Sequence, residues 1–153
     1  MNLFTFVFGE KPRPKAPPVI SEPPAHVAWH NVRPKAGQPA VHARRAEADC
    51  VVETGQGQLK ARGGVDYIIT YAPDDTAVIS GEIFEATYEP AGDGLYRKRT
   101  DVVFRYFTLP YACIVETREG PQRAKPGDWI MQGVQGELWP IPAEKTESKY
   151  DPA

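Results

Sequence analysis

The chain contains two copies of one sequence pattern, and this internal repeat constrains its fold more than any other feature. Residues 50–54 (CVVET) match residues 113–117 (CIVET), and with one residue inserted in the first copy Asp66 aligns with Asp128. About fifteen of roughly forty aligned positions between residues 50 and 153 are identical, several times the number expected by chance. A repeat of about 62 residues predicts two equivalent structural units.

The pattern within each copy predicts short strands joined by turns and followed by one helix. The 16 prolines and 13 glycines of the full chain favour short strands over long helices. In the first copy we predict strands at residues 39–45, 49–54, 66–71 and 76–79, then a helix capped by Ser80. In the second copy we predict strands at residues 101–107, 112–117, 128–132 and 137–141, then a helix at residues 143–150.

We therefore expect an α+β, mainly β fold made of two tandem repeats of a small β-sheet and hairpin unit. Each repeat ends in a short helix in this scheme. The two repeats pack with pseudo-two-fold symmetry, because a unit of this size lies near the lower limit for folding alone. Residues 32–91 form repeat 1, residues 92–153 form repeat 2, and residues 91–94 are the hinge between them.

Residues 1–31 form a separate N-terminal region. The apolar stretch at residues 1–9 is predicted to dock as an edge strand on the folded body, or alternatively on a partner. The proline-rich stretch at residues 10–24 is predicted to be an extended tether without regular structure.

Charge and cysteine content limit the classes of partner and compartment. The formal net charge of -2 gives no overall field that would attract nucleic acid or an anionic membrane. No stretch approaches the roughly 20 apolar residues of a membrane span, so we predict a cytoplasmic protein. Cys50 and Cys113 lie at equivalent places inside apolar runs. We expect buried free thiols there, with a bridge between the copies as the alternative.

One short motif connects the chain to a known family. Residues 126–129 (PGDW) resemble the motif of small bacterial and phage proteins named after a Pro-Gly-Asp-Tyr-Gly sequence. The chain is also similar to phage proteins that open with a Tyr-Arg-Lys-Lys-Pro run and close with an Ile-Phe-Glu-Ala-Thr-Tyr-Glu helix. Residues 96–99 (YRKR) and 83–89 (IFEATYE) match those two segments.

The match to this family has two departures. Ile130 stands where the named motif has glycine, and residues 64–67 (GVDY) replace the motif in the first copy. The resemblance implies a small strand-rich domain with a terminal helix and a phage or mobile-element origin. It implies no activity.

Histidines and carboxylates are the candidates for metal binding and catalysis. His26 and His30 have the spacing of two ligands on one helix face, and His42 is a third candidate. No cysteine cluster or carboxylate-rich stretch accompanies them, so we predict surface or core histidines, no metal and no cofactor. Asp66 and Asp128 each begin a predicted strand, where aspartate usually caps a turn; acid–base chemistry by such a pair is the alternative.

Aromatic and basic residues provide the predicted contact surface. Trp129 and Trp139 lie on the two arms of one predicted hairpin and can share a face, either in the core or at a contact. Basic residues beside aromatic ones suit single-stranded nucleic acid, but acidic residues such as Asp101 interrupt them. The candidate binding residues are Trp129, Trp139, Tyr67, Asp66, Asp128, Arg97 and Arg105.

These observations predict a non-catalytic binding or regulatory module. Its contact surface is the seam between the repeats or the hairpin surface, and its partner is an unidentified protein or small molecule. Nucleic acid and membrane are not expected partners. One alternative is a small carboxylate-dependent enzyme, which requires a deep pocket holding an aspartate or glutamate with a raised pKa. The other is a single-stranded nucleic-acid binder.

Overall fold

The computed structural model describes residues 16–153. Over this range the protein is mainly β, with four sheets, one α-helix and one short 3₁₀ helix. The apolar stretch at residues 1–9 and the first part of the proline-rich tether lie outside the described residues. The later part of the tether contains a two-residue strand, β1 (Val19–Ile20), where we expected no regular structure.

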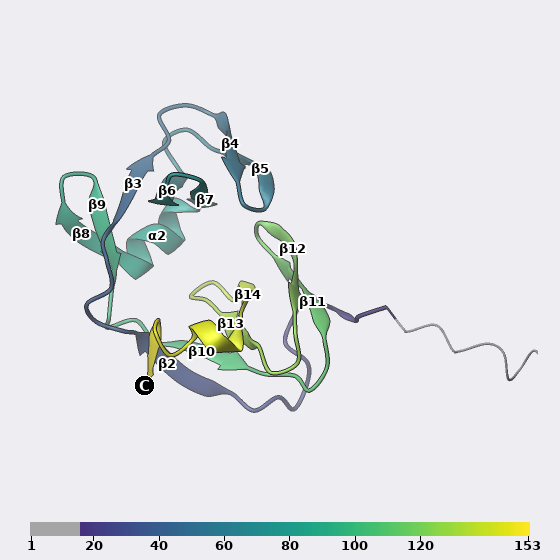
Figure 1. The fold of residues 1–153 in the computed structure, drawn as a ribbon. Coiled ribbons are helices and arrows are strands. Elements are labelled where there is room, and N and C mark those ends of the chain that lie inside the picture. Colours follow the sequence, from purple (N-terminus) through teal and green to yellow (C-terminus); the bar gives the residue numbers. More distant parts are fainter. Residues whose placement is uncertain (1–15) are drawn as a thin grey trace, which may run out of the picture.

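Two five-stranded sheets form the main body, with sheet I in the upper half of Figure 1 and sheet II in the lower half. Sheet I contains, in spatial order, β7 (Asp75–Ile79), β6 (Tyr67–Ala72), β3 (Val41–Arg45), β9 (Leu95–Lys98) and β8 (Tyr88–Gly92). Sheet II contains, in spatial order, β14 (Leu138–Ile141), β13 (Trp129–Gln132), β10 (Phe104–Phe107), β2 (His30–Pro34) and β15 (Tyr150–Pro152).

Two hairpins project from these sheets. Hairpin I pairs β4 (Cys50–Thr54) with β5 (Gly57–Ala61). Hairpin II pairs β11 (Cys113–Thr117) with β12 (Gly120–Ala124), and β1 runs parallel to β11 at its outer edge. Each turn is closed by a threonine, because Thr54 Oγ1 donates to the Gly57 carbonyl and Thr117 Oγ1 to the Gly120 carbonyl.

Strands β2 and β9 join sheets formed mostly by other parts of the chain. Strand β2 precedes β3 in sequence, yet it lies in sheet II between β10 and β15. Strand β9 precedes β10, yet it lies in sheet I between β3 and β8. The chain therefore passes between the two halves more than once, which fixes the sheets relative to each other (Figure 1).

Strand pairing follows the same pattern in both sheets. In sheet I Tyr67 pairs with Ile79, and in sheet II Trp129 pairs with Ile141. At the other edge, Tyr88 pairs with Lys98 in sheet I, whereas Tyr150 pairs with Pro34 in sheet II. Lysine and proline thus occupy matching places in the two sheets.

The helix predicted after Ser80 is present as α2 (Gly81–Thr87). The Ser80 hydroxyl accepts a hydrogen bond from the Ile83 N–H, which caps the helix N-terminus. Ile83, Phe84 and Thr87 are buried, and the Phe84 ring stacks on Tyr67 with ring centroids 4.0 Å apart. The helix is held by this apolar face, as expected of a helix of two turns.

The helix predicted at residues 143–150 is wrong. Only a 3₁₀ turn, η1 (Ala143–Lys145), forms there, and the chain returns to strand at β15. Lys145, Thr146 and Lys149 stand where α2 has Ile83, Phe84 and Thr87. Without apolar side chains on one face, a short helix gains too little from packing to persist.

Three smaller expectations also differ from the structure. Neither half ends in a helix, because β8 follows α2 and β15 follows η1. Residues 91–94, expected as a hinge, contain the turn of the β8–β9 hairpin. Cys50 is exposed and Cys113 is buried, and both are free thiols. The burial expected for Cys50 is therefore wrong, because hairpin I projects from the body with few covered positions.

Candidate ligand-binding site

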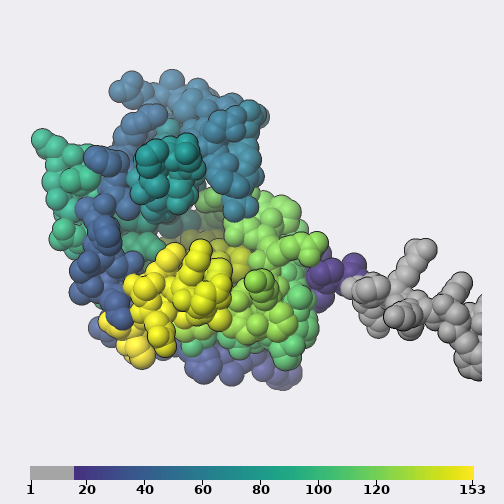
Figure 2. Space-filling view, in the orientation of Figure 1, coloured from purple at the N-terminus to yellow at the C-terminus, as the bar shows by residue number. Residues whose placement is uncertain are grey.

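A cavity of about 290 Å³ lies in the seam between sheets I and II. We call it the seam cavity; the space-filling view shows the molecule hollowed between the upper blue and lower yellow-green parts (Figure 2). Its walls are mainly apolar and aromatic, which is typical of pockets for small molecules. Residues that line it include Ile79, Tyr88 and Lys98 from sheet I, Phe104, Trp139 and Tyr150 from sheet II, and Glu119 from the turn of hairpin II.

One lysine, Lys98, is among the residues that line this cavity. It is the last residue of β9, its backbone is paired with Tyr88, and its Nζ lies 5.6 Å from the ring centroid of Tyr150. A cation at this distance from an aromatic face is weakly attracted to the ring. Strand pairing on one side and the tyrosine ring on the other therefore hold the amine in the seam.

Lys98 has no acidic partner within the part of the chain that the structure describes. The ion pairs there join other residues, such as Arg99 with Asp101 at 2.8 Å. Burial lowers the pKa of the Lys98 ammonium to about 8, and the positive charge of Lys149 acts in the same direction. At neutral pH the cavity therefore holds a mostly charged amine that lacks a counter-ion.

Three tyrosines line the cavity, Tyr71 and Tyr88 from sheet I and Tyr150 from sheet II. Tyr88 is 8% exposed and Tyr150 is 4% exposed, and burial raises the pKa of both phenols above their ordinary value. Both hydroxyls are consequently neutral over the physiological range. Each can donate one hydrogen bond and accept others.

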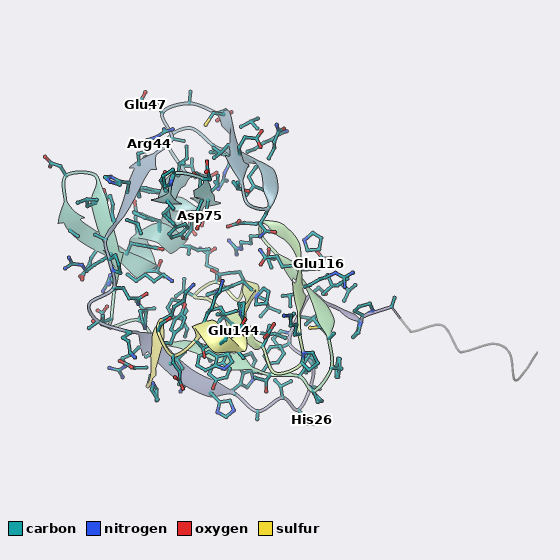
Figure 3. The ribbon with its side chains drawn as sticks, viewed as in Figure 1. His26, Arg44, Glu47, Asp75, Glu116 and Glu144 are labelled. Carbon is teal, nitrogen blue, oxygen red and sulfur yellow. The ribbon has the colours of Figure 1, made fainter. Side chains whose placement is uncertain are left out.

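Glu119, in the turn of hairpin II, places a carboxyl group in the wall of the cavity. Its N–H donates to Thr117 Oγ1 at 3.1 Å, which fixes the turn. Burial raises the pKa of the Glu119 carboxyl, and the negative charge of Asp75 adds to this effect. Figure 3 labels Asp75 in the upper half of the molecule, so a charge from sheet I acts on a carboxyl of hairpin II.

A chain of polar side chains connects three elements across the seam. Gln135, in the β13–β14 loop, donates from Nε2 to Glu82 of α2 at 2.6 Å. Its Oε1 accepts a hydrogen bond from Arg118, beside Glu119 in the turn of hairpin II, at 2.9 Å. All three groups are exposed, so these bonds join the two halves at the surface.

The two tryptophans predicted as binding residues face different hollows. Trp139 lines the seam cavity. Trp129 lines a separate open groove, where it stacks on Tyr106 with ring centroids 3.6 Å apart. Both are half-buried and pack against the same apolar cluster on one face of sheet II. The shared face predicted from their spacing is present, but only Trp139 reaches the seam cavity.

Asp66 and Asp128 each stabilise a turn by accepting a hydrogen bond from a backbone N–H group. Asp66 is 5% exposed and accepts hydrogen bonds from the N–H and guanidinium of Arg62. Asp128 is 8% exposed and accepts from the N–H groups of Lys125 and Ala143, at 2.8 and 3.1 Å. Neither carboxylate lines the seam cavity.

The remaining predicted site residues also lie outside the seam cavity. Tyr67 stacks on Phe84 of α2, and its hydroxyl accepts a hydrogen bond from Arg45. Arg97 is exposed on β9. The Arg105 guanidinium carbon lies 3.8 Å from the ring centroid of Trp29, and its Nε donates to Gln132.

The histidines do not form a metal site in residues 16–153, where no group of three or more histidine, cysteine, aspartate or glutamate side chains could hold an ion. His26, labelled at the lower edge of Figure 3, lies away from the seam. His30 stacks on Tyr106 with ring centroids 5.1 Å apart, and His42 pairs with Thr70 in sheet I.

The predicted binding residues do not include Lys98, Tyr88, Tyr150 or Glu119. One signal was present for the tyrosines, since Tyr88 and Tyr150 are identical residues at aligned positions of the two copies. No comparable signal marked Lys98, because it lies in a basic run (YRKR) in which every neighbour is an equally good candidate.

No protein-family model, curated protein or solved structure matches this chain. In the described part of the chain, no helix has the length and apolar character needed to cross a membrane.

Proposed function

We propose that this protein is a small-molecule-binding module and that its ligand is a small, mainly apolar molecule with one acidic group. The ligand occupies the seam cavity, and its acidic group pairs with the ammonium of Lys98. A module of this kind binds through the seam and needs no chemical step.

The single observation that carries this proposal is the unpaired Lys98 in a mainly apolar cavity. An ammonium group without a counter-ion in such surroundings destabilises the folded protein, because burial removes water without supplying a partner. A ligand carboxylate restores the missing interaction. The aromatic and aliphatic walls then bind the rest of the ligand by burial of apolar surface.

The size of the cavity limits the ligand. A volume of about 290 Å³ is at the lower end of the range for small-molecule pockets. The Tyr150 hydroxyl can bind the second carboxylate oxygen, since it stays protonated as a donor. Medium-chain fatty acids and benzoate-like acids have the required combination of groups.

Calorimetry with octanoate and 1-octanol tests the proposal, because the two differ mainly in the acidic group. At pH 7 and low salt we expect octanoate to bind the wild-type protein more tightly than octanol. Lys98→Met should weaken octanoate binding about tenfold or more and change octanol binding by less than about threefold.

Lys60→Met is the matched control for this experiment. Lys60 is exposed on hairpin I and does not line the cavity, so its loss should leave both affinities unchanged. Equal affinity for octanoate and octanol in the wild-type protein would sink the proposal. So would an equal loss of octanoate binding in the two variants.

We further propose that the two halves derive from a duplicated unit packed with pseudo-two-fold symmetry and with first strands exchanged. The support is the agreement in register: Tyr67–Ile79 and Trp129–Ile141 are the same pair 62 residues apart. Strands β2 and β9 are the first strands of the two units, and each pairs in the sheet of the other. The seam cavity is then an interface between copies, with tyrosine from each.

The resemblance to the phage and bacterial family of the Pro-Gly-Asp-Tyr-Gly motif stays a proposal. So do an origin in phage or mobile elements and a cytoplasmic location. The segment that carries the motif forms the turn before β13, where the Asp128 carboxylate binds two backbone N–H groups. This turn supplies a structural use for the motif without any reaction.

A small carboxylate-dependent enzyme is the second candidate, and one observation favours it. Glu119 lines the seam cavity, and its pKa is raised by burial, as a general acid requires. Glu119→Gln separates the two functions, because it abolishes acid catalysis and leaves a binding module able to bind octanoate. Unchanged octanoate affinity in Glu119→Gln, with no turnover of acid esters by the wild-type protein, would remove the enzyme.

A further inference from the structure

We propose that Lys98 also forms a reversible imine with small aldehydes or ketones that enter the seam cavity. The site then captures carbonyl compounds covalently in addition to binding acids. This inference rests on the proposed function in one respect, namely that the seam cavity is a ligand site.

The position of the amine is the first support. Lys98 lies at the end of β9, where its backbone is fixed by pairing with Tyr88, and its Nζ lies beside the ring of Tyr150. Both tyrosines line the cavity, as Lys98 does. A carbonyl carbon inside the cavity is therefore within the volume that this side chain can reach.

The charged and titratable groups around the amine are the second support. They are Tyr71 on β6, Tyr88 on β8, Lys149 just before β15, Tyr150 at the start of β15, Arg118 and Glu119 in hairpin II, and Glu137 beside β14. None of the carboxylates forms an ion pair with Lys98 among the described residues. The second cation, Lys149, further disfavours the ammonium form.

A lysine in apolar surroundings and beside another cation has the features of an activated amine nucleophile. Burial lowers the pKa of Lys98 to about 8, so a useful fraction of the amine is neutral near neutral pH. An exposed lysine, with a pKa of about 10.4, has a far smaller neutral fraction at the same pH.

The reaction balances with the groups already in the cavity. The neutral amine attacks the carbonyl carbon, the C–N bond forms, and a proton passes from nitrogen to oxygen to give a carbinolamine. A proton from an acidic group then lets the C–O bond break, so that water leaves and the C=N bond forms. Glu119 suits the role of acid, because burial keeps its carboxyl protonated to higher pH than usual. No oxidant or reductant is consumed.

Trapping with benzaldehyde and sodium cyanoborohydride tests this inference. The reductant converts an imine into a stable benzyl amine, which mass spectrometry of proteolytic peptides locates. At pH 7.5 we expect benzyl adducts at Lys98 to exceed those at exposed Lys60 by at least about tenfold, because the lowered pKa of Lys98 leaves more of its amine neutral. Excess octanoate should suppress the adduct at Lys98 and leave the adduct at Lys60 unchanged.

Lys98→Arg separates amine chemistry from charge. Arginine keeps the cation but forms no imine under these conditions, so Lys98→Arg should lose the selective adduct, whereas Lys60→Arg should leave octanoate binding and the adduct at Lys98 unchanged. Equal labelling of Lys98 and Lys60 in the wild-type protein, with octanoate still bound, would overturn the imine and leave the ligand site standing. Selective, octanoate-insensitive labelling of Lys98 without octanoate binding would instead keep the amine chemistry and overturn the acid-binding function.

Discussion

Gln135 donates a hydrogen bond from its side-chain amide to the carboxylate of Glu82 at 2.6 Å, although the two residues are 53 positions apart in sequence. This bond joins the β13–β14 loop to α2. Arg118, in the turn of hairpin II, completes the connection by donating to the same side chain of Gln135. Three elements that surround the seam cavity are therefore linked through one residue.

Replacement of Gln135 by alanine should remove this link between the elements around the cavity. In Gln135→Ala we expect octanoate to dissociate about two- to fivefold faster, because two surface hydrogen bonds worth about 1 kcal/mol or less in total are lost. Stopped-flow fluorescence of Trp139, which lines the cavity, measures the rate. Gln56→Ala in the turn of hairpin I is the control, and identical dissociation rates in both variants would contradict a role for the link.

Gly81 should tolerate no side chain. A Cβ at this first residue of α2 would collide with the Val65 carbonyl oxygen. Gly81→Ala should therefore destabilise the protein by about 2–4 kcal/mol, although alanine normally stabilises a helix relative to glycine. Gly55→Ala is the control, since nothing lies within 4 Å of its Cβ position. Urea denaturation gives both values, and a stabilised Gly81→Ala would show the close packing of α2 to be wrong.

Lys98 should lower stability in a pH-dependent manner. Its folded pKa of about 8 lies below the ordinary value of 10.5, so the unfolded chain binds more protons between these pH values and wild-type stability rises as pH increases through that window. Lys98→Met removes the buried charge. It should add about 1–2 kcal/mol to the free energy of unfolding at pH 7, a figure reduced for partial exposure, and this gain should fade toward pH 10.5. A constant difference between pH 7 and 10.5 would contradict the lowered pKa.

Asp66 should stabilise the folded protein at neutral pH and lose this effect at acidic pH. The Arg62 side chain, hydrogen-bonded to this carboxylate, lowers its pKa below the ordinary 3.8. The ionised form therefore stabilises the folded protein above that pH, and the contribution is lost as pH falls through the folded pKa. Asp66→Asn should cost about 1–3 kcal/mol at pH 7 and progressively less below about pH 4. The exposed Asp93→Asn serves as control, and an Asp66→Asn cost that does not change with pH would contradict the ion pair.

The local elements were predictable because turn-forming residues and apolar alternation mark them in the sequence. Ser80 caps α2 as expected, and the hairpin of β13 and β14 forms where glycines bracket the loop. The predicted second helix failed because residues 143–150 contain turn-compatible polar residues but no apolar face. Propensity and a plausible start signal were not enough without a surface to pack.

The pairing of distant strands and the site itself were not predictable. Nothing in β2 or β9 indicates that each pairs in a sheet formed mostly by other parts of the chain, because a strand edge accepts any partner with a matching apolar pattern. The seam cavity arises from that arrangement. Lys98 becomes a site residue only because Tyr88 and Tyr150 are brought around it, which no short stretch of sequence records.

The uptake of protons on octanoate binding tests the pairing of ligand and Lys98 most directly. Near pH 8 about half of the Lys98 side chains are charged, and a bound carboxylate should raise the lysine pKa. Calorimetry at pH 8 in two buffers of different ionisation enthalpy should therefore show uptake of up to about half a proton per octanoate, with none in Lys98→Met. Octanoate that binds without proton uptake, or with equal uptake in the variant, would contradict a ligand site centred on Lys98.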